Sequence, residues 1–205
     1  IKQAWDNRQM DVVESLMPTL RDYPLYPYLE YRQLSGDLMN TPSLAVTNFV
    51  QANPTLPPAR TLKNRFVNEL ARREDWRGLL AFSPDKPGTT EAQCNYYYAK
   101  YSVGDAQGAW EGAKTLWLTG QNRPNACDKL FSVWRSSGTQ DPLAYLERIR
   151  LVMKAGNTGL VKALASQMPS EYQTIATAIT DLANNPNNVL TFARTTGATD
   201  FTRQL

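Results

Sequence analysis

The side chains best able to perform chemistry in this 205-residue chain are its nineteen carboxylates, because the sequence contains no histidine. Without an imidazole there is no Ser-His-Asp or Cys-His arrangement, and the commonest metal ligand is missing as well. Two carboxylates could still serve as general acid and base, and Glu147 is the best single candidate. A helical Glu with an Arg three residues later usually forms a surface ion pair, which is the interpretation we favour. We therefore assign no catalytic residue, no cofactor site and no metal site.

Glycine spacing gives no phosphate-binding loop of either the dinucleotide or the P-loop kind. Gly104, Gly108 and Gly112 recur every four residues, which places them along one face of a helix. Small residues on a helix face allow a neighbouring helix or side chain to approach closely. The glycines therefore predict tight packing.

The chain has two cysteines, Cys94 and Cys127. In a reducing compartment they would be two buried thiols that pack as small apolar groups. In an oxidising compartment an even pair in a soluble domain indicates one disulfide, which would join a helix beginning near Thr90 to one beginning near Pro124. The residues alone leave both interpretations open.

Aromatic and basic residues each gather in restricted segments. Tyrosines cluster in residues 23–31 and 96–101, where sugar stacking is one interpretation and core packing is the favoured one. Glu69 lies four residues after one arginine and three or four before two others, so a self-paired, solvated face is favoured over an anion site. The basic residues of this region are Arg60, Lys63, Arg65, Arg72, Arg73 and Arg77.

The elements that carry these residues are predicted to be helices. A tight turn between two amphipathic segments recurs in residues 4–17, 70–80, 101–110 and 153–161. One helical hairpin cannot bury its apolar stripe alone, so such units stack into a solenoid with an extended surface. Leu62, Phe66 and Leu70 form one apolar stripe, and residues 146, 149 and 153 form another.

Capping and proline signals place the helix ends. Thr41 and Asp141 each precede a proline suited to the first helical position, and Thr90 and Ser170 begin capping-box patterns. Proline breaks divide the chain into about ten or eleven helices. We expect an all-α fold: a tetratricopeptide-like α-superhelix of antiparallel helical hairpins, forming a single domain over residues 1–205.

Bulk properties add few constraints. The net charge is +3, and the basic residues are spread through the chain rather than gathered in a nucleic-acid-binding run. No apolar stretch approaches the roughly 18 to 20 residues that span a bilayer, so we expect a soluble domain without a membrane span. Helical character in residues 1–5 and the lack of a stop signal in residues 201–205 suggest a piece of a longer protein.

Three segments resemble one enzyme family. Residues 49–60, 70–84 and 124–131 are similar to the N-terminal part of the soluble lytic murein transglycosylases, and the resemblance extends along the whole chain. It implies a periplasmic enzyme of Gram-negative bacteria that cleaves the MurNAc–GlcNAc β-1,4 bond of peptidoglycan and leaves a 1,6-anhydro sugar. It also implies that no cofactor is needed and that Cys94 and Cys127 form a disulfide.

The resemblance covers only the superhelical region of that family, which forms part of a ring. The catalytic lysozyme-like domain is expected downstream, and none of its motifs occurs here, so no catalytic residue is transferred and the segment alone is expected to be inactive. Its expected partners are glycan strands and its own C-terminal catalytic domain. The alternative is a non-enzymatic tetratricopeptide-like adaptor that binds a protein or peptide.

Overall fold

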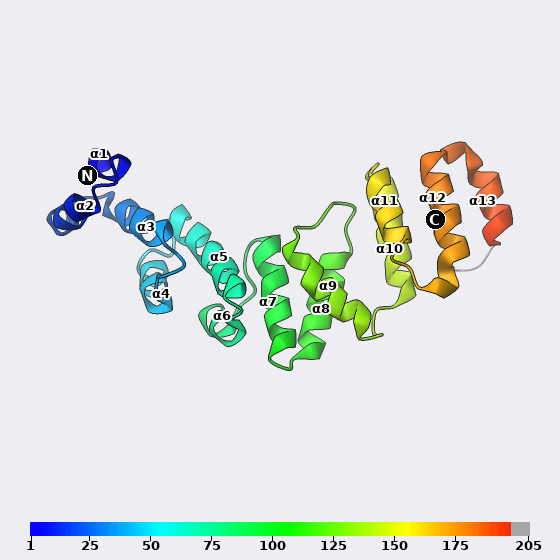
Figure 1. Ribbon diagram of the computed structural model, residues 1–205, viewed down its shortest axis with the longest axis horizontal. Helices are drawn as coiled ribbons and strands as arrows, with labels where there is room; N and C mark the ends of the chain where they lie inside the picture. Colours follow the sequence, from blue (N-terminus) through cyan, green and yellow to red (C-terminus); the bar gives the residue numbers. More distant parts are fainter. Residues whose placement is uncertain (198–205) are drawn as a thin grey trace. The chain divides into compact units, whose positions relative to one another are not determined.

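The chain folds into helices throughout the part that the structure describes. This structure, a computed structural model, describes residues 1–197, which contain thirteen α-helices, three short 3₁₀ helices and no strand. The all-α prediction is confirmed, whereas ten or eleven helices was an underestimate because several short helices follow one another without a proline between them. The chain divides into two compact units, residues 1–92 and 93–205 (Figure 1). The expectation of a single domain remains a prediction.

The first unit contains six complete α-helices and the start of a seventh. Successive helices pack against one another, as α4 does on α5 and α5 on α6. The bounds are α1 Lys2–Asp6, α2 Met10–Leu16, η1 Met17–Leu20, α3 Tyr26–Gly36, α4 Ser43–Ala52, α5 Pro57–Arg72, α6 Trp76–Phe82 and α7 Thr90–Ser102, the last of which continues into the second unit.

The second unit also packs helices that are neighbours in sequence. The α10–α11 and α11–α12 pairs have extensive interfaces, and α8 packs on α9. The bounds are α8 Ala106–Trp117, α9 Ala126–Ser136, α10 Pro142–Lys154, α11 Thr158–Ala165, η2 Ser170–Tyr172, α12 Gln173–Asn184, η3 Pro186–Asn188 and α13 Val189–Thr196.

The recurring hairpin turns share one backbone geometry. In each turn a residue with positive φ, between 57° and 99°, reverses the chain, and the next residue caps the following helix with φ between −94° and −83° and ψ near 70°. In three of the four turns that capping side chain accepts a hydrogen bond from a backbone N–H of the helix's first turn. The four pairs are Arg8–Gln9, Glu74–Asp75, Gly104–Asp105 and Gly156–Asn157.

The predicted caps had mixed outcomes. Asp141 caps α10 as expected, because its Oδ1 accepts a hydrogen bond from Leu143 N at 2.9 Å. Thr41 does not cap α4, since its hydroxyl donates to backbone carbonyls at the end of the preceding helix. The α7 cap is Thr89, one residue before the predicted Thr90, and Ser170 begins a 3₁₀ helix without a side-chain cap.

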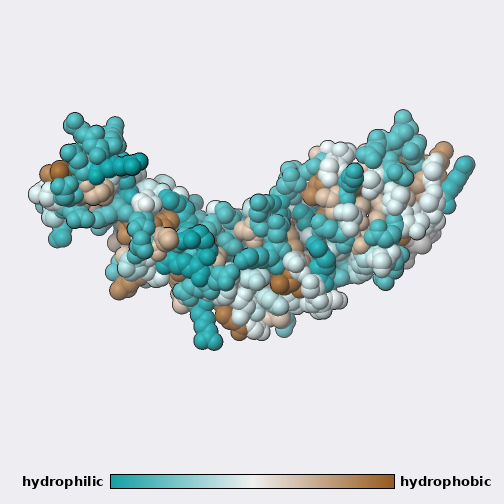
Figure 2. Space-filling model, in the orientation of Figure 1, coloured by the Kyte–Doolittle hydropathy of each residue, from teal (hydrophilic) through white to brown (hydrophobic). Residues whose placement is uncertain are grey.

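Each unit buries its own apolar residues. In the first unit the stripe of Leu62, Phe66 and Leu70 is fully buried on α5, as predicted. In the second, a continuous core runs from α7 to α13 and is built around Trp117. The visible surface is mostly hydrophilic, with small separate apolar patches (Figure 2). No helix within residues 1–197 has the length and apolarity needed to cross a bilayer.

Candidate functional site

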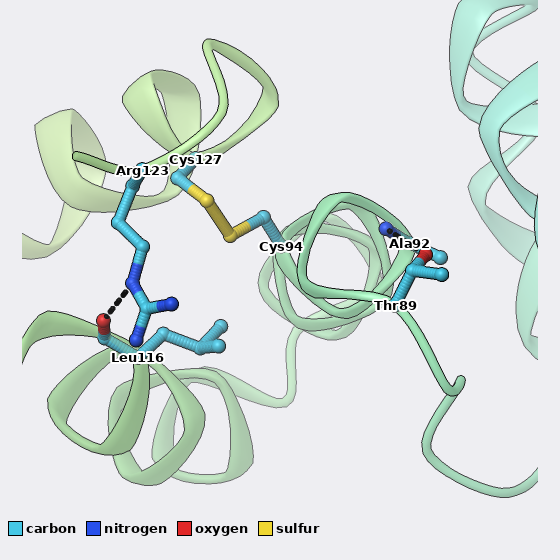
Figure 3. Close-up of a disulfide and its surroundings, with 6 residues drawn as sticks. All are labelled: Thr89, Ala92, Cys94, Leu116, Arg123 and Cys127. Atoms are coloured by element: carbon cyan, nitrogen blue, oxygen red, sulfur yellow. Dashed lines mark hydrogen bonds between the residues drawn. A yellow bond between two sulfur atoms is a disulfide. The ribbon is translucent and has the colours of Figure 1, made fainter. Parts of the chain in front are cut away.

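The two cysteines form a disulfide in the second unit. Cys94 lies in the first turns of α7 and Cys127 in the first turn of α9, with their Cα atoms 4.8 Å apart (Figure 3). Both side chains are fully buried in the core. The bond implied by the family resemblance is therefore present, and it fastens the start of α7 to the start of α9 across the α7–α8 hairpin.

Three glutamates considered as possible acids, Glu30, Glu111 and Glu147, have different surroundings. Glu147 is half exposed and lies 3.5 Å from Arg150 Nη2, which confirms the surface ion-pair interpretation. Glu111 is exposed on α8, with a long contact to the Gln107 amide. Glu30 differs, because it is half-buried beside a cavity of about 340 Å³ and burial raises its pKa. A raised pKa is the direction that a general acid requires.

In the basic region, one carboxylate pairs with two arginines at the C-terminal end of α5. Glu69 accepts hydrogen bonds from Arg72 Nε at 2.8 Å and from Arg73 Nε at 3.0 Å. The hydrogen bond from Arg72 is the largest cause of a low Glu69 pKa, which falls to about 2. The prediction of a paired face rather than an anion site is confirmed for these two arginines.

The tyrosine clusters are only partly packed. Tyr96 is buried as favoured, whereas Tyr23 and Tyr28 are about half exposed, so the packing interpretation is wrong for those two residues. Tyr101 is exposed and lies with its ring centroid 5.2 Å from that of Trp110. This pair is the aromatic surface of the second unit that could stack against a flat ligand.

Close packing explains the glycine at position 112. A Cβ there would lie 2.2 Å from Cδ1 of the Tyr97 ring, so the residue on α8 must be glycine for α7 to approach this closely. Gly104 instead supplies the positive φ of the α7–α8 turn. The packing interpretation is confirmed for Gly112.

A cavity of about 650 Å³ lies among α8, α9, α10 and α11, entirely within the second unit. Its wall is unusual in carrying three arginines, of which Arg148 is buried at 4% exposure. The charged and aromatic residues of the lining are Trp117, Arg123, Asp128, Phe131, Arg135 and Arg148.

Sequence reasoning missed this cavity. Glu147 is the residue of this helix that the sequence suggests as a possible acid, and its neighbour Arg148 is not among the predicted site residues. The available signal was helical phase: Arg148 lies three residues after Tyr145 and four before Val152, on the buried stripe of α10. Within residues 1–197, no three Cys, Asp or Glu side chains are placed to hold a metal ion.

The fold and these features define an all-α protein of stacked helical hairpins with one disulfide. No family model matches the chain. The chain is 80% identical over all 205 residues to the soluble lytic murein transglycosylase of Escherichia coli K12 and equally to that of Salmonella typhimurium LT2. It is therefore homologous to a segment of the soluble lytic murein transglycosylases, as its sequence resemblance indicated. The chain spans about a third of the length of these relatives, 32% in each case.

Solved structures agree with this assignment. A complex of the 70-kDa soluble lytic transglycosylase with bulgecin A matches with a TM-score of 0.94 at 81% identity, covering 99% of this chain and 33% of that one. An inactive mutant of the lytic transglycosylase Slt from Pseudomonas aeruginosa matches with a TM-score of 0.80 at 29% identity, covering 94% and 31%. The helical-hairpin solenoid is therefore the fold of this part of those enzymes.

Proposed function

We propose that the chain is the superhelical scaffold segment of a periplasmic peptidoglycan lytic transglycosylase. In this proposal a catalytic domain elsewhere in the same protein cleaves the MurNAc–GlcNAc bond and forms the 1,6-anhydro product. The segment frames that domain, as part of a ring, and helps to hold glycan strands. The identity of 80% along all 205 residues is the observation that carries the proposal, and it favours the scaffold over a free-standing adaptor.

The chemistry of the described residues is consistent with a supporting role. Forming an anhydro ring needs an acid that protonates the glycosidic oxygen and then accepts a proton as a base. Glu147 is ion-paired at the surface, and Glu30, whose pKa is raised by burial, lies on the first unit beside a cavity of about 340 Å³. The Cys94–Cys127 disulfide suits an oxidising compartment such as the periplasm.

The test compares the intact enzyme with a form that lacks residues 1–205. We expect the shortened enzyme to release anhydro-muropeptides from intact sacculi more slowly and to sediment less with them. On short soluble glycan fragments the two forms should differ much less, because strand holding matters most on the polymer. Equal binding and equal rates on sacculi would contradict the scaffold role.

A further inference from the structure

The guanidinium of Arg148 is a buried cation that forms no ion pair with any residue in the described range 1–197. Its side chain is almost fully buried, and Nε makes no hydrogen bond to any residue that the structure describes. Arg148 lies on α10. Within residues 1–197 the only ion pair on this helix joins Glu147 to Arg150 and does not include Arg148. A buried charge with no partner is costly, so a site of this kind is stabilised when an anion enters it.

Aromatic rings hold this cation in place. The Arg148 Cζ lies 4.1 Å from the centroid of the Trp117 ring and 5.7 Å from that of Phe131. Trp117 is itself fixed, because its Nε1 donates to the Ala144 carbonyl at 2.9 Å and its ring packs edge-on against Tyr145. These ring contacts restrict the guanidinium, whose planar fork suits the two oxygens of a carboxylate.

The other charged residues of the wall make the cavity net positive. Arg123 is held by a hydrogen bond from its Nε to the Leu116 carbonyl at 2.7 Å (Figure 3), and Arg135 by bonds to the Tyr145 hydroxyl and the Gln167 amide oxygen. Both charges therefore lie near the cavity, and neither arginine has an acidic partner among residues 1–197. Burial and, after it, the charge of Arg123 lower the Arg148 pKa to about 10, so Arg148 remains a cation at neutral pH.

The size and the remaining lining point to an organic ligand rather than a bare ion. A volume of about 650 Å³ falls in the range of small-molecule sites, about 300 to 1,000 Å³. Phe131, Leu160 and Leu164 offer apolar contact, while Asp128 offers an acceptor for N–H groups. A ligand with a carboxylate, a short apolar part and an N–H donor matches this set.

We propose that the cavity binds the carboxylate of an amino-acid- or short-peptide-sized ligand, with Arg148 as the ion-pair partner of that carboxylate. The two sources of such a group are a free acylated amino acid and the C-terminus of a peptide. The site lies in the scaffold segment itself and does not depend on catalysis by another domain.

The experiment titrates the chain with N-acetylalanine and N-acetylalanylalanine, each beside its C-terminal amide, by calorimetry and by the indole N–H signals of ¹⁵N-labelled protein. We expect both acids, or the dipeptide alone, to bind and to shift the Trp117 indole signal, while the amides do neither. Tighter binding of the dipeptide would identify a peptide C-terminus as the source of the carboxylate. Equal binding of the two acids would identify a free acylated amino acid. Binding of acid and amide alike, or of inorganic phosphate but neither acid, would overturn the proposal.

Two matched variants locate the binding. Arg148→Met should weaken acid binding by about tenfold or more, since a charged hydrogen-bonded contact is lost. Arg150→Met makes the same charge change two residues away at an exposed position and should leave affinity within about twofold. Equal affinity in wild type and a folded Arg148→Met protein would overturn the assignment. The comparison of acid with amide on the wild-type chain decides the question even if that variant does not fold.

Discussion

Gly112 of α8 lies directly against the ring of Tyr97 on α7, so closely that a Cβ at Gly112 would be 2.2 Å from the ring's Cδ1 atom. Tyr97 is itself constrained, because its ring packs edge-on against Tyr96 at a centroid distance of 5.2 Å. The α7–α8 hairpin therefore depends on the absence of a side chain at one position. This hairpin is also the part of the second unit that the disulfide encloses.

Gly112→Ala should consequently lower the free energy of unfolding, by about 1 to 3 kcal/mol, because the new methyl group forces a ring or a helix to move. Chemical denaturation measures the change. The matched control is Gly159→Ala on α11, where a Cβ would meet nothing within 4 Å. That variant should be neutral or more stable by up to about 1 kcal/mol, as alanine favours helix. A Gly112→Ala protein as stable as wild type would contradict the close packing.

Removing the disulfide should destabilise the second unit. Cys94 and Cys127 are 33 residues apart, and closing a loop of this length stabilises by about 3 to 4 kcal/mol in the chain-entropy model. We expect a double Cys→Ser variant to lose up to that amount in chemical denaturation and to match reduced wild-type protein. Mass spectrometry of unreduced protein from an oxidising compartment should find the cross-linked peptides. Two freely alkylated thiols there would show the bond to be absent.

Glu69 should make stability depend on acid pH. Its pKa falls from about 4.5 to about 2 on folding, chiefly through the hydrogen bond from Arg72. Between these values the unfolded chain binds more protons, so the contribution of Glu69 is full above pH 4.5 and disappears as the pH falls toward 2. Glu69→Gln should therefore be less stable than wild type at pH 7, with a difference that shrinks through this window.

The control for that measurement is Glu147→Gln, which removes a more exposed ion pair with an O–N separation of 3.5 Å. Exposed pairs contribute little, so its stability should stay close to that of wild type at every pH. A Glu69→Gln deficit that is constant from pH 7 to pH 2.5 would assign the effect to packing rather than to the Arg72 and Arg73 hydrogen bonds.

Local signals predicted the helical fold and its apolar stripes, but only one of the four predicted caps. Asp141 before Pro142 caps α10 as expected, and the apolar stripe of α5 is buried. Thr41 does not cap α4 because its hydroxyl donates hydrogen bonds to the carbonyls of Leu34 and Asp37. These bonds depend on how the preceding helix ends. Exposure of Tyr23 and Tyr28 likewise follows from packing that sequence spacing does not encode.

The arginine cavity could not be predicted in the same way. Helical phase places Arg148 among buried residues of α10, but the Trp117 ring that covers it belongs to α8, and Arg123 comes from the loop before α9. These three meet only through tertiary packing. Sequence can thus indicate that an arginine lies on a buried helix face. Only the structure shows that no acidic side chain among the described residues pairs with it.

We propose that this segment supports a lytic transglycosylase without cleaving glycan itself. The most direct measurement incubates the purified chain with intact peptidoglycan sacculi and analyses the soluble fraction for anhydro-muropeptides. We predict no release above a buffer blank for wild type or for Glu30→Gln, Glu111→Gln and Glu147→Gln. Release of anhydro products by the wild-type chain, abolished by one of these substitutions and most tellingly by Glu30→Gln, would contradict the scaffold assignment and place an active site on the solenoid.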